Sequence, residues 1–225
     1  MSLFLDFDGT LIEIAEGPDA IAVPADLGAR LERLACRLDG RLAIVSGRGV
    51  DNLTRFLGPV PLYLAGSHGA DVRAPLGATL RVAEPLPESV AERLRLFAAD
   101  NGLLYENKPH GAALHYRARP DFEDTALRFA ENLAAEHAMA IKTGKCVVEM
   151  MQPGADKGGA VDLLGGQSPF AGATPVFLGD DMTDEDGFAA CERRGGFGIA
   201  VGDRVSQTAR YSLGTVKDVI AWLEL

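Results

Sequence analysis

Four short apolar runs in this chain each stop at a polar residue or a glycine. They are residues 3–5 before Asp6, 42–45 before Ser46, 62–65 before Gly66, and 176–178 before Gly179 and Asp180. Short runs that are apolar on both faces are typical of buried parallel strands. Leucines at helical spacing, at positions 27, 31, 34 and 38, separate the first two runs. This alternation predicts a doubly wound, mostly parallel α/β sheet.

The middle of the chain has a different pattern. A helical stripe over 90–97 precedes two strand-like runs, 103–106 and 112–116. A second helix beginning at 121 then precedes two more runs, 139–142 and 146–150, and this order predicts an antiparallel α+β unit. The total of 225 residues suffices for one core with a modest insert. We therefore expect a core at 1–84 and 151–225 with a small inserted cap at 85–150.

The overall charge restricts the possible partners. The net charge is −10, so most of the surface would repel nucleic acid and acidic lipid. No apolar run approaches the ~18 residues of a membrane span. The three cysteines, Cys36, Cys146 and Cys191, are widely spaced, which favours a reducing cytoplasm over a disulfide framework. We expect a cytoplasmic protein that binds neither nucleic acid nor membrane.

Asp6 and Asp8 follow the first predicted strand. Residues i and i+2 of an extended chain face the same way, so the two carboxylates would leave the strand end together. Gly9 permits a tight turn, with amide groups exposed beside a cation site. The alternative is a solvated turn with accidental acids, because Asp and Gly are common in turns.

A second acidic string follows the last run, from Gly179 to Asp186. It contains five carboxylates within seven residues, which repel one another unless they are solvated, hydrogen-bonded or bound to a cation. Oxygen ligands select a hard ion such as Mg²⁺, and the spacing of a calcium loop is absent. Acids also suit a helix N-terminus. We expect both: Asp184 to Asp186 cap a helix, and Asp180 reaches the metal.

Two more segments offer groups that suit an anion. Ser46-Gly47-Arg48 supplies a hydroxyl, an amide and a guanidinium at a strand end, although Ser-Gly is also a common turn. Lys157 could neutralise a phosphoryl oxygen, although a surface lysine is the alternative for this residue taken alone. The segment around it does not match a Walker A loop.

The order of these four pieces on an α/β sheet resembles the haloacid dehalogenase superfamily of phosphotransferases. Further strings are similar to those of the trehalose-6-phosphate phosphatases. They are Gly66-Ser67-His68-Gly69, Lys108 ahead of Leu114-His115-Tyr116-Arg117, Gly144-Lys145-Cys146-Val147-Val148-Glu149, and Gly179-Asp180-Asp181-Met182-Thr183-Asp184-Glu185. The resemblance covers nearly the whole chain and also matches the position of the cap.

The resemblance implies a Mg²⁺-dependent phosphatase with an aspartyl-phosphate intermediate. Asp6 would be the nucleophile, and Asp8 the acid toward the leaving sugar and the base toward water. Asp6, Asp180 and the main-chain carbonyl of Asp8 would hold the metal, while Ser46 and Lys157 would hold the phosphoryl group. Three further residues would lie around these ligands: Thr10 would hydrogen-bond near Asp8 or the loop, Asp184 would orient the waters of the metal, and Asp181 would lie beside them.

Substrate contacts are expected from both parts of the chain. In the core they are Gly47, Arg48, Gly66 and His68, and in the cap they are Asn107, Lys108, Arg117 and Glu149. Glu149 is the expected acceptor for two neighbouring sugar hydroxyls, because an unpaired buried carboxylate would reject analogues that lack them. For His115 the sequence favours neither of two roles, packing in the core of the cap or contact with the sugar.

The expected substrate is trehalose 6-phosphate, as part of trehalose biosynthesis. A phosphatase or phosphomutase acting on another sugar phosphate is the alternative enzyme, and a sugar-phosphate sensing module is the alternative without turnover. Because Asp6 and Asp8 are both present, the sensing module is disfavoured. We expect a monomer that is functionally paired with a trehalose-6-phosphate synthase, and the sequence does not require physical contact between them.

Overall fold

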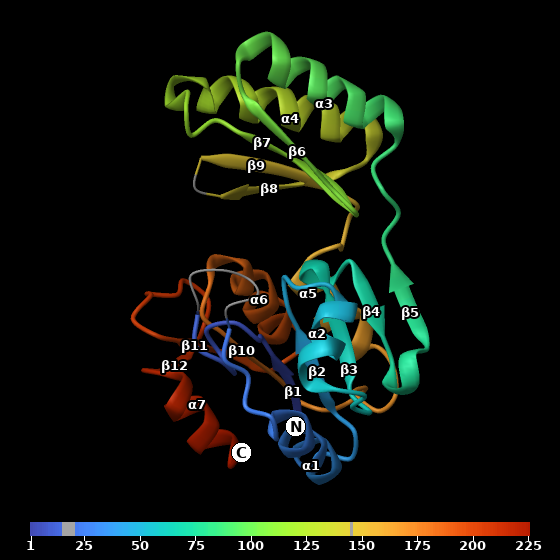
Figure 1. The fold of residues 1–225 in the computed structure, drawn as a ribbon, viewed down its shortest axis with the longest axis vertical. Coiled ribbons are helices and arrows are strands. Elements are labelled where there is room, and N and C mark those ends of the chain that lie inside the picture. The colour runs from blue at the N-terminus through green and yellow to red at the C-terminus, as the bar shows by residue number, and fades with distance from the viewer. Residues whose placement is uncertain (15–20, 145) are drawn as a thin grey trace. The chain divides into compact units, whose positions relative to one another are not determined.

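The four apolar runs form neighbouring strands in the computed structural model, which describes residues 1–14, 21–144 and 146–225. They are β1 (Ser2–Leu5), β2 (Leu42–Val45), β3 (Tyr63–Gly66) and β10 (Pro175–Gly179). Within the described residues the sheet has the order β12-β11-β10-β1-β2-β3-β4-β5 (Figure 1). Its other strands are β4 (Asp71–Arg73), β5 (Thr79–Val82), β11 (Phe197–Val201) and β12 (Tyr211–Leu213).

Most of this sheet is parallel. Strands β1, β2, β3, β10, β11 and β12 pair in parallel, and only the β3-β4-β5 edge is antiparallel among the described strands. Parallel strands need crossover connections, and these are supplied by helices on the faces of the sheet. The predicted doubly wound α/β core is confirmed.

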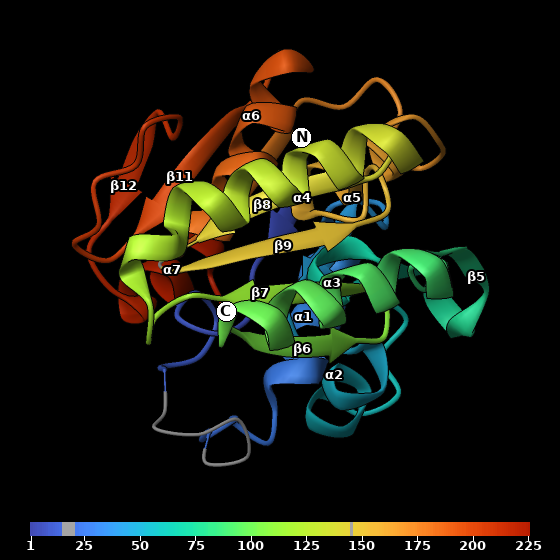
Figure 2. The ribbon, with the colours of Figure 1, turned by 90° about the horizontal axis from the view of Figure 1, so that it is seen from above.

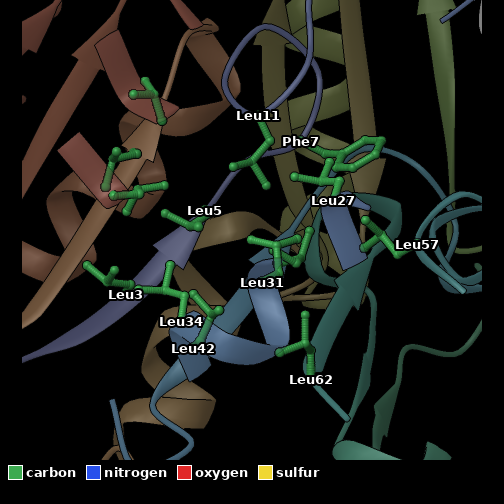
Figure 3. Close-up of a cluster of buried hydrophobic side chains, with 14 of the residues drawn as sticks. Leu3, Leu5, Phe7, Leu11, Leu27, Leu31, Leu34, Leu42, Leu57 and Leu62 are labelled. Atoms are coloured by element: carbon green, nitrogen blue, oxygen red, sulfur yellow. The ribbon is translucent and has the colours of Figure 1, made fainter. Parts of the chain in front are cut away.

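Helices cover both faces of the sheet. One face packs on α1 (Leu27–Arg37), α2 (Val50–Leu57) and α7 (Val216–Leu223), and the other on α5 (Lys157–Gly165) and α6 (Glu185–Arg193). Leu3 and Leu5 of β1 belong to the first cluster, whereas Phe4 belongs to the second. Figure 3 shows the first cluster, in which leucines of β1, β2 and α1 gather with Phe7. A strand buried on both faces explains why the β1 run is apolar throughout.

The inserted segment forms a second unit with its own core. It contains α3 (Glu88–Asn101), α4 (Glu123–His137) and an antiparallel sheet of β6 (Leu104–Lys108), β7 (Gly111–His115), β9 (Val147–Met151) and β8 (Ala140–Gly144), in that order. Figures 1 and 2 show α3 and α4 on one face of this sheet. Phe97 of α3 and Phe129 of α4 stack with ring centroids 4.0 Å apart. We call this unit the cap and its uncovered sheet face the open face.

The two units divide at positions close to the predicted ones. The core unit contains Met1–Val82 and Asp156–Leu225, and the cap contains Ala83–Ala155. The cap therefore begins two residues before the expected 85 and ends five after the expected 150. At its start the Ala83 carbonyl is 2.6 Å from Nδ1 of His110, which ties Ala83 to the β6–β7 turn. Lys145, part of the Gly-Lys-x-Val-Val-Glu string, lies outside the described residues.

The cysteines and the helices bear on the expected surroundings of the protein. Cys36, Cys146 and Cys191 are all free thiols. Within the described ranges, every helix is too short or too polar to cross a bilayer.

Candidate active site

The strand ends bring the predicted residues to one edge of the core sheet. Strands β1 and β10 are neighbours, with Leu5 opposite Leu178, so Asp6 and Asp180 emerge side by side. The Asp6 amide donates to the Leu178 carbonyl at 2.9 Å, which fixes this register. A pocket of about 710 Å³ opens here. Its lining is Asp6, Asp8, Ile14, Ser46, Gly47, Arg48, Gly49, Asn52, His68, Lys157, Asp180, Asp181 and Thr183.

Lys157 lies at the base of this pocket between two carboxylates. Its Nζ donates to Oδ1 of Asp6 at 2.7 Å and to Oδ1 of Asp184 at 2.6 Å. All three residues are buried, with Asp184 fully excluded from solvent. Lys157 opens α5, where Asp156 caps the helix by accepting from the Gly159 amide at 2.7 Å. The helix start therefore sets where the ammonium enters the site, and Lys157 is not a surface lysine.

Burial and charge shift the acidities of these groups. Burial raises the pKa of Asp6 well above its ordinary value, and Lys157 offsets only part of this effect. Burial, together with the charge of Asp184, raises the pKa of Asp180 to about 6. Burial alone would lower the pKa of Lys157, but Asp6 and Asp184 outweigh it and raise that pKa above its usual range. The ammonium therefore stays charged, whereas burial disfavours the ionised form of the carboxylates in the absence of a further cation.

The same carboxylates fit a divalent cation. Oxygen atoms of Asp6, Asp180 and Asp184 lie within 4.8 Å of one another. Among the described residues, Oδ1 of Asp180 is buried and has no hydrogen-bond partner. Three carboxylates and one ammonium leave two negative charges, which a divalent cation would balance. Oxygen donors alone select a hard ion of the Mg²⁺ type.

Asp184 has less freedom than the other two to bind such an ion directly. Its Oδ1 accepts from Lys157, and its Oδ2 accepts from the Asp181 amide at 2.8 Å. Asp181 in turn accepts from the Met182 amide at 2.6 Å, and the side chains of Asp181 and Asp184 form a reciprocal capping box on the short helical turn Met182–Asp184. Asp184 therefore orients Lys157 and the acidic loop, and Asp181 caps this turn at the pocket edge.

Two glycines allow the acids to approach. Gly9 has φ +77°, and a Cβ there would lie 2.2 Å from Oδ2 of Asp180. A Cβ at Gly179 would lie 2.2 Å from Cγ of Asp184. Any side chain at either position would displace a carboxylate, and at Gly9 it would also strain the backbone.

The turn after Asp6 uses two of its amides internally and departs from the expectation for Thr10. The amides of Gly9 and Leu11 are bonded to main-chain carbonyls within the turn, at 2.8 and 3.0 Å, so they are not available to an anion. The expected hydrogen bond from Thr10 does not form. Its Oγ1 is fully buried and has no partner among the described residues. Thr10 packs beneath the turn, because the chain after Gly9 folds back into the core at Leu11.

Arg48 contacts Asp8 through two parallel hydrogen bonds. Nε is 2.6 Å from Oδ2, and Nη2 is 2.7 Å from Oδ1. Nη1 donates to Oδ1 of Asn52 at 3.1 Å, and the guanidinium lies 5.3 Å from the ring centroid of Phe56. Both supporting residues lie on α2, at positions 4 and 8 after Arg48. The group expected as a donor to phosphate is thus engaged with the expected acid–base residue.

Three neighbouring residues differ in their access to the pocket. His68 lines it and packs against Gly47, where a Cβ would lie 2.8 Å from Cε1 of the imidazole. Ser46 lines it too, and its Oγ accepts from the Arg48 amide at 3.1 Å. Gly66 does not line it. It is buried under the 48–50 loop, where a Cβ would lie 2.5 Å from the Val50 amide nitrogen. Gly66 therefore has a packing role, not the expected substrate contact.

The open face of the cap contains an acid and a base in contact. Lys108 of β6 and Glu149 of β9 form an ion pair. The register places Glu106 opposite Ala113, and Ala113 opposite Glu149, so Glu106 lies on the same face. Nε2 of His115 is 2.8 Å from Oε2 of Glu106, which places the imidazole there as well. Ala113, which lies between Glu106 and Glu149 in this register, contributes only a methyl group to the face.

Two expected sugar-binding residues lie elsewhere. Asn107 pairs with Ala112, and alternation along β6 puts it on the face opposite Lys108 and Glu149. There it accepts from the Tyr105 hydroxyl at 3.3 Å. Arg117 is exposed just beyond the end of β7. Asn107 is therefore separated from the Lys108–Glu149 pair.

Four residues near these sites were not anticipated. They are Asn52 and Thr183 in the pocket, Glu106 on the cap, and Arg204 behind the acidic loop. Asn52 follows Arg48 by one helical turn and Glu106 precedes Lys108 by two strand positions, so both spacings were available as signals. Nothing in the sequence links Arg204 to the acidic loop.

Comparison with known proteins gives a consistent result. The family model for trehalose-phosphatase matches residues 4–216. The trehalose-6-phosphate phosphatase of Escherichia coli (strain K12) is 40% identical over 228 residues, covering 99% of this chain and 85% of that protein. The structure of Aspergillus fumigatus trehalose-6-phosphate phosphatase aligns with a TM-score of 0.80 at 29% identity, covering 99% of this chain and 91% of that one.

A more distant likeness supports the fold alone. A haloacid dehalogenase-like hydrolase from Bacillus subtilis aligns with a TM-score of 0.74 at 15% identity, covering 100% of this chain and 99% of that one. The match to the family model spans both units, and the Asp6, Ser46, Lys157 and Asp180 segments meet at one pocket. The chain therefore belongs to the trehalose-phosphatase family and has the haloacid dehalogenase fold.

Proposed function

We propose that this protein hydrolyses trehalose 6-phosphate to trehalose and inorganic phosphate through an aspartyl-phosphate at Asp6. The observation that carries the proposal is the buried Asp6–Lys157–Asp184 arrangement at the base of an open pocket. The 40% identity to the Escherichia coli trehalose-6-phosphate phosphatase supports the choice of substrate.

Magnesium held by Asp6, Asp180 and the main-chain carbonyl of Asp8 would offset the repulsion between the Asp6 carboxylate and the phosphoryl oxygens. Lys157 would offset the same repulsion, because its ammonium lies 2.7 Å from Oδ1 of Asp6. The hydroxyl of Ser46 is a further donor at the pocket wall. Together these groups hold the phosphoryl group in line with Asp6.

In the first step an Asp6 oxygen attacks phosphorus, and the bond from phosphorus to the sugar oxygen breaks. Asp8 donates a proton to the departing oxygen, which leaves as the free hydroxyl of trehalose. In the second step Asp8 takes a proton from water, whose oxygen attacks phosphorus. The bond to Asp6 then breaks, which releases phosphate and restores the carboxylate.

Arg48 orients the Asp8 carboxylate for these two proton transfers. Its two hydrogen bonds fix the plane of the Asp8 carboxylate, and Asn52 and Phe56 hold the guanidinium in turn. Asp8 must release one of these bonds when it carries a proton. Arg48 can then turn that donor toward a phosphoryl oxygen at the pocket wall.

The sugar is assigned to the open face of the cap. Glu149 and Lys108 offer an acceptor and a donor to neighbouring hydroxyls, and Glu106 adds a second carboxylate on the same face. The free cysteines agree with a cytoplasmic enzyme, and such an enzyme would act on the product of a trehalose-6-phosphate synthase.

Phosphate release from a panel of phosphorylated disaccharides and hexoses, assayed with Mg²⁺, tests this function. We expect trehalose 6-phosphate to be hydrolysed with the highest kcat/KM. Equal rates across hexose phosphates would contradict the assigned substrate. Isomerised sugar phosphate without phosphate release would indicate a phosphomutase, and tight binding without turnover would indicate a sensing module.

A further inference from the structure

Arg204 binds the acidic loop from the side away from the pocket lining. It lies in the segment that follows β11. Its Nε donates to the main-chain carbonyl of Asp180 at 3.0 Å, and its Nη2 donates to that of Asp181 at 3.0 Å. Its Nη1 lies 2.6 Å from Oε1 of Glu185. Nη1 also lies 3.5 Å from Sδ of Met182, so one planar guanidinium contacts four positions of a six-residue stretch.

Glu185 completes this arrangement. Its second oxygen, Oε2, accepts from the Thr208 amide at 3.1 Å, so the carboxylate joins α6 to the same segment that carries Arg204. Glu185 belongs to the acidic string, yet it is neither in the pocket lining nor among the clustered carboxylates. The Arg204 and Glu185 side chains are only 23% and 16% exposed. Glu185 is therefore an anchor for Arg204 and not a metal ligand.

The acidic loop needs such an anchor for an electrostatic reason. Asp180 lies beside Asp6 and Asp184, and like charges at this spacing push the loop away from the sheet edge. The Asp180 main chain has just left β10, so the contacts of its carbonyl oppose that movement, together with the bond from the Asp181 amide to Asp184. The Arg204 guanidinium donates to the Asp180 and Asp181 carbonyls simultaneously. These two bonds fix both the direction of the loop and its distance from Arg204.

We propose that Arg204, anchored by Glu185, is a positioning residue that aims the Asp180 carboxylate at the cation. This inference rests on the proposed function. Arg204 would act through the main chain of Asp180 and would touch neither substrate nor metal. Outer partners of this kind typically change metal affinity by about 10–100-fold when removed.

The sign of the effect separates positioning from charge alone. Removing a positive charge near the carboxylates strengthens cation binding if Arg204 acts only by Coulomb repulsion. Loss of positioning weakens cation binding instead. A purely structural role lowers the melting temperature and leaves the affinity for the ion unchanged.

The experiment is calorimetric titration of the intact protein with Mg²⁺ in the absence of substrate. Arg204→Ala is expected to raise the Kd about 10-fold or more. Glu185→Gln, which keeps the side-chain size, is expected to raise it by a smaller factor, and Arg204→Lys to restore it only in part. Arg193→Ala is the matched control, because it removes a surface arginine that pairs with Asp162 at 2.9 Å.

An unchanged or lower Kd in folded Arg204→Ala would overturn the inference, as would a wild-type protein that binds no Mg²⁺. If Arg204→Ala fails to fold, Glu185→Gln decides by the same criterion. Phosphatase activity provides a second readout, since saturating Mg²⁺ should restore kcat in the variants. A wild type that binds Mg²⁺ and shows the Arg204 effect but releases no phosphate would overturn the proposed function and leave the positioning role intact.

Discussion

Arg48 binds Asp8 in a two-pronged contact, with Nε 2.6 Å from Oδ2 and Nη2 2.7 Å from Oδ1. The Arg48 side chain is 11% exposed and that of Asp8 is 33% exposed, so Asp8 is the more accessible partner of the pair. Bidentate geometry fixes both the position and the plane of a carboxylate. The proposed proton donor is thus oriented before any sugar phosphate arrives.

Arg48→Ala should therefore impair leaving-group protonation. We expect kcat for trehalose 6-phosphate to fall about 100-fold, within the range for general acid catalysis. For p-nitrophenyl phosphate, whose leaving group needs no proton, the fall should be far smaller. Steady-state kinetics on both substrates measure this difference, and Arg55→Ala, on the helix α2 that follows Arg48, is the control. Equal losses on the two substrates would instead indicate a phosphate contact.

Metal removal should have a direct effect on activity and stability. Excess chelator is expected to stop turnover, and added Mg²⁺ to restore it. Mg²⁺ should also raise the melting temperature of the wild type, because it binds only the folded carboxylate cluster. Asp180→Asn should lose most of this rise, as followed by differential scanning calorimetry. Activity that persists in excess chelator would rule out the metal.

Glu149→Gln should affect the sugar and spare the phosphoryl chemistry. The substitution keeps the side-chain size but removes the charge that pairs with Lys108. We expect kcat/KM for trehalose 6-phosphate to fall by about 10²-fold, as for loss of a charged hydrogen-bond acceptor. Hydrolysis of p-nitrophenyl phosphate should change little. Glu131→Gln, an exposed position on α4, is the matched control. A uniform loss on both substrates would count against sugar recognition by Glu149.

Ionisation of Tyr116 should lower the stability of the cap at high pH. Burial and a 3.0 Å hydrogen bond to Glu123 raise the pKa of this phenol to about 12, against an unfolded value of about 10. Its stabilising effect is therefore complete below pH ~10 and is lost as the pH rises toward 12. Tyr116→Phe should be less stable by about 1 kcal/mol at pH 8, and the gap should close at high pH. Urea unfolding across this range, with Tyr211→Phe as the exposed control, measures the gap. A gap that stays constant would contradict this account.

The buried strands of the core sheet could be predicted from the sequence. The run at 42–45 forms β2 with the same limits, because a strand buried on both faces is apolar throughout. The edge strands β4 and β5 had no such signal, since most of their residues are only partly buried or exposed. They extend the sheet in antiparallel fashion and are recognisable only from the pairing of β4 with β3 and of β5 with β4.

Prediction of the site depended on whether a residue is placed by the order of the strands or by contacts between distant side chains. Asp6 and Asp180 could be brought together because both follow strands of one parallel sheet. Lys157 needed the family resemblance, since nothing in its local sequence distinguishes it from a surface lysine. The Arg48–Asp8 and Arg204–Glu185 contacts depend on how loops far apart in the chain pack, which residue spacing does not encode.

The central claim is that the phosphoryl group passes through Asp6. Acid quenching of a single turnover with trehalose 6-phosphate, followed by borohydride reduction, converts an aspartyl-phosphate to homoserine, which peptide mass spectrometry locates. We predict homoserine at position 6 in the wild type and none in Asp6→Asn. Homoserine at another aspartate, or its absence from position 6 while phosphate is released, would contradict the account.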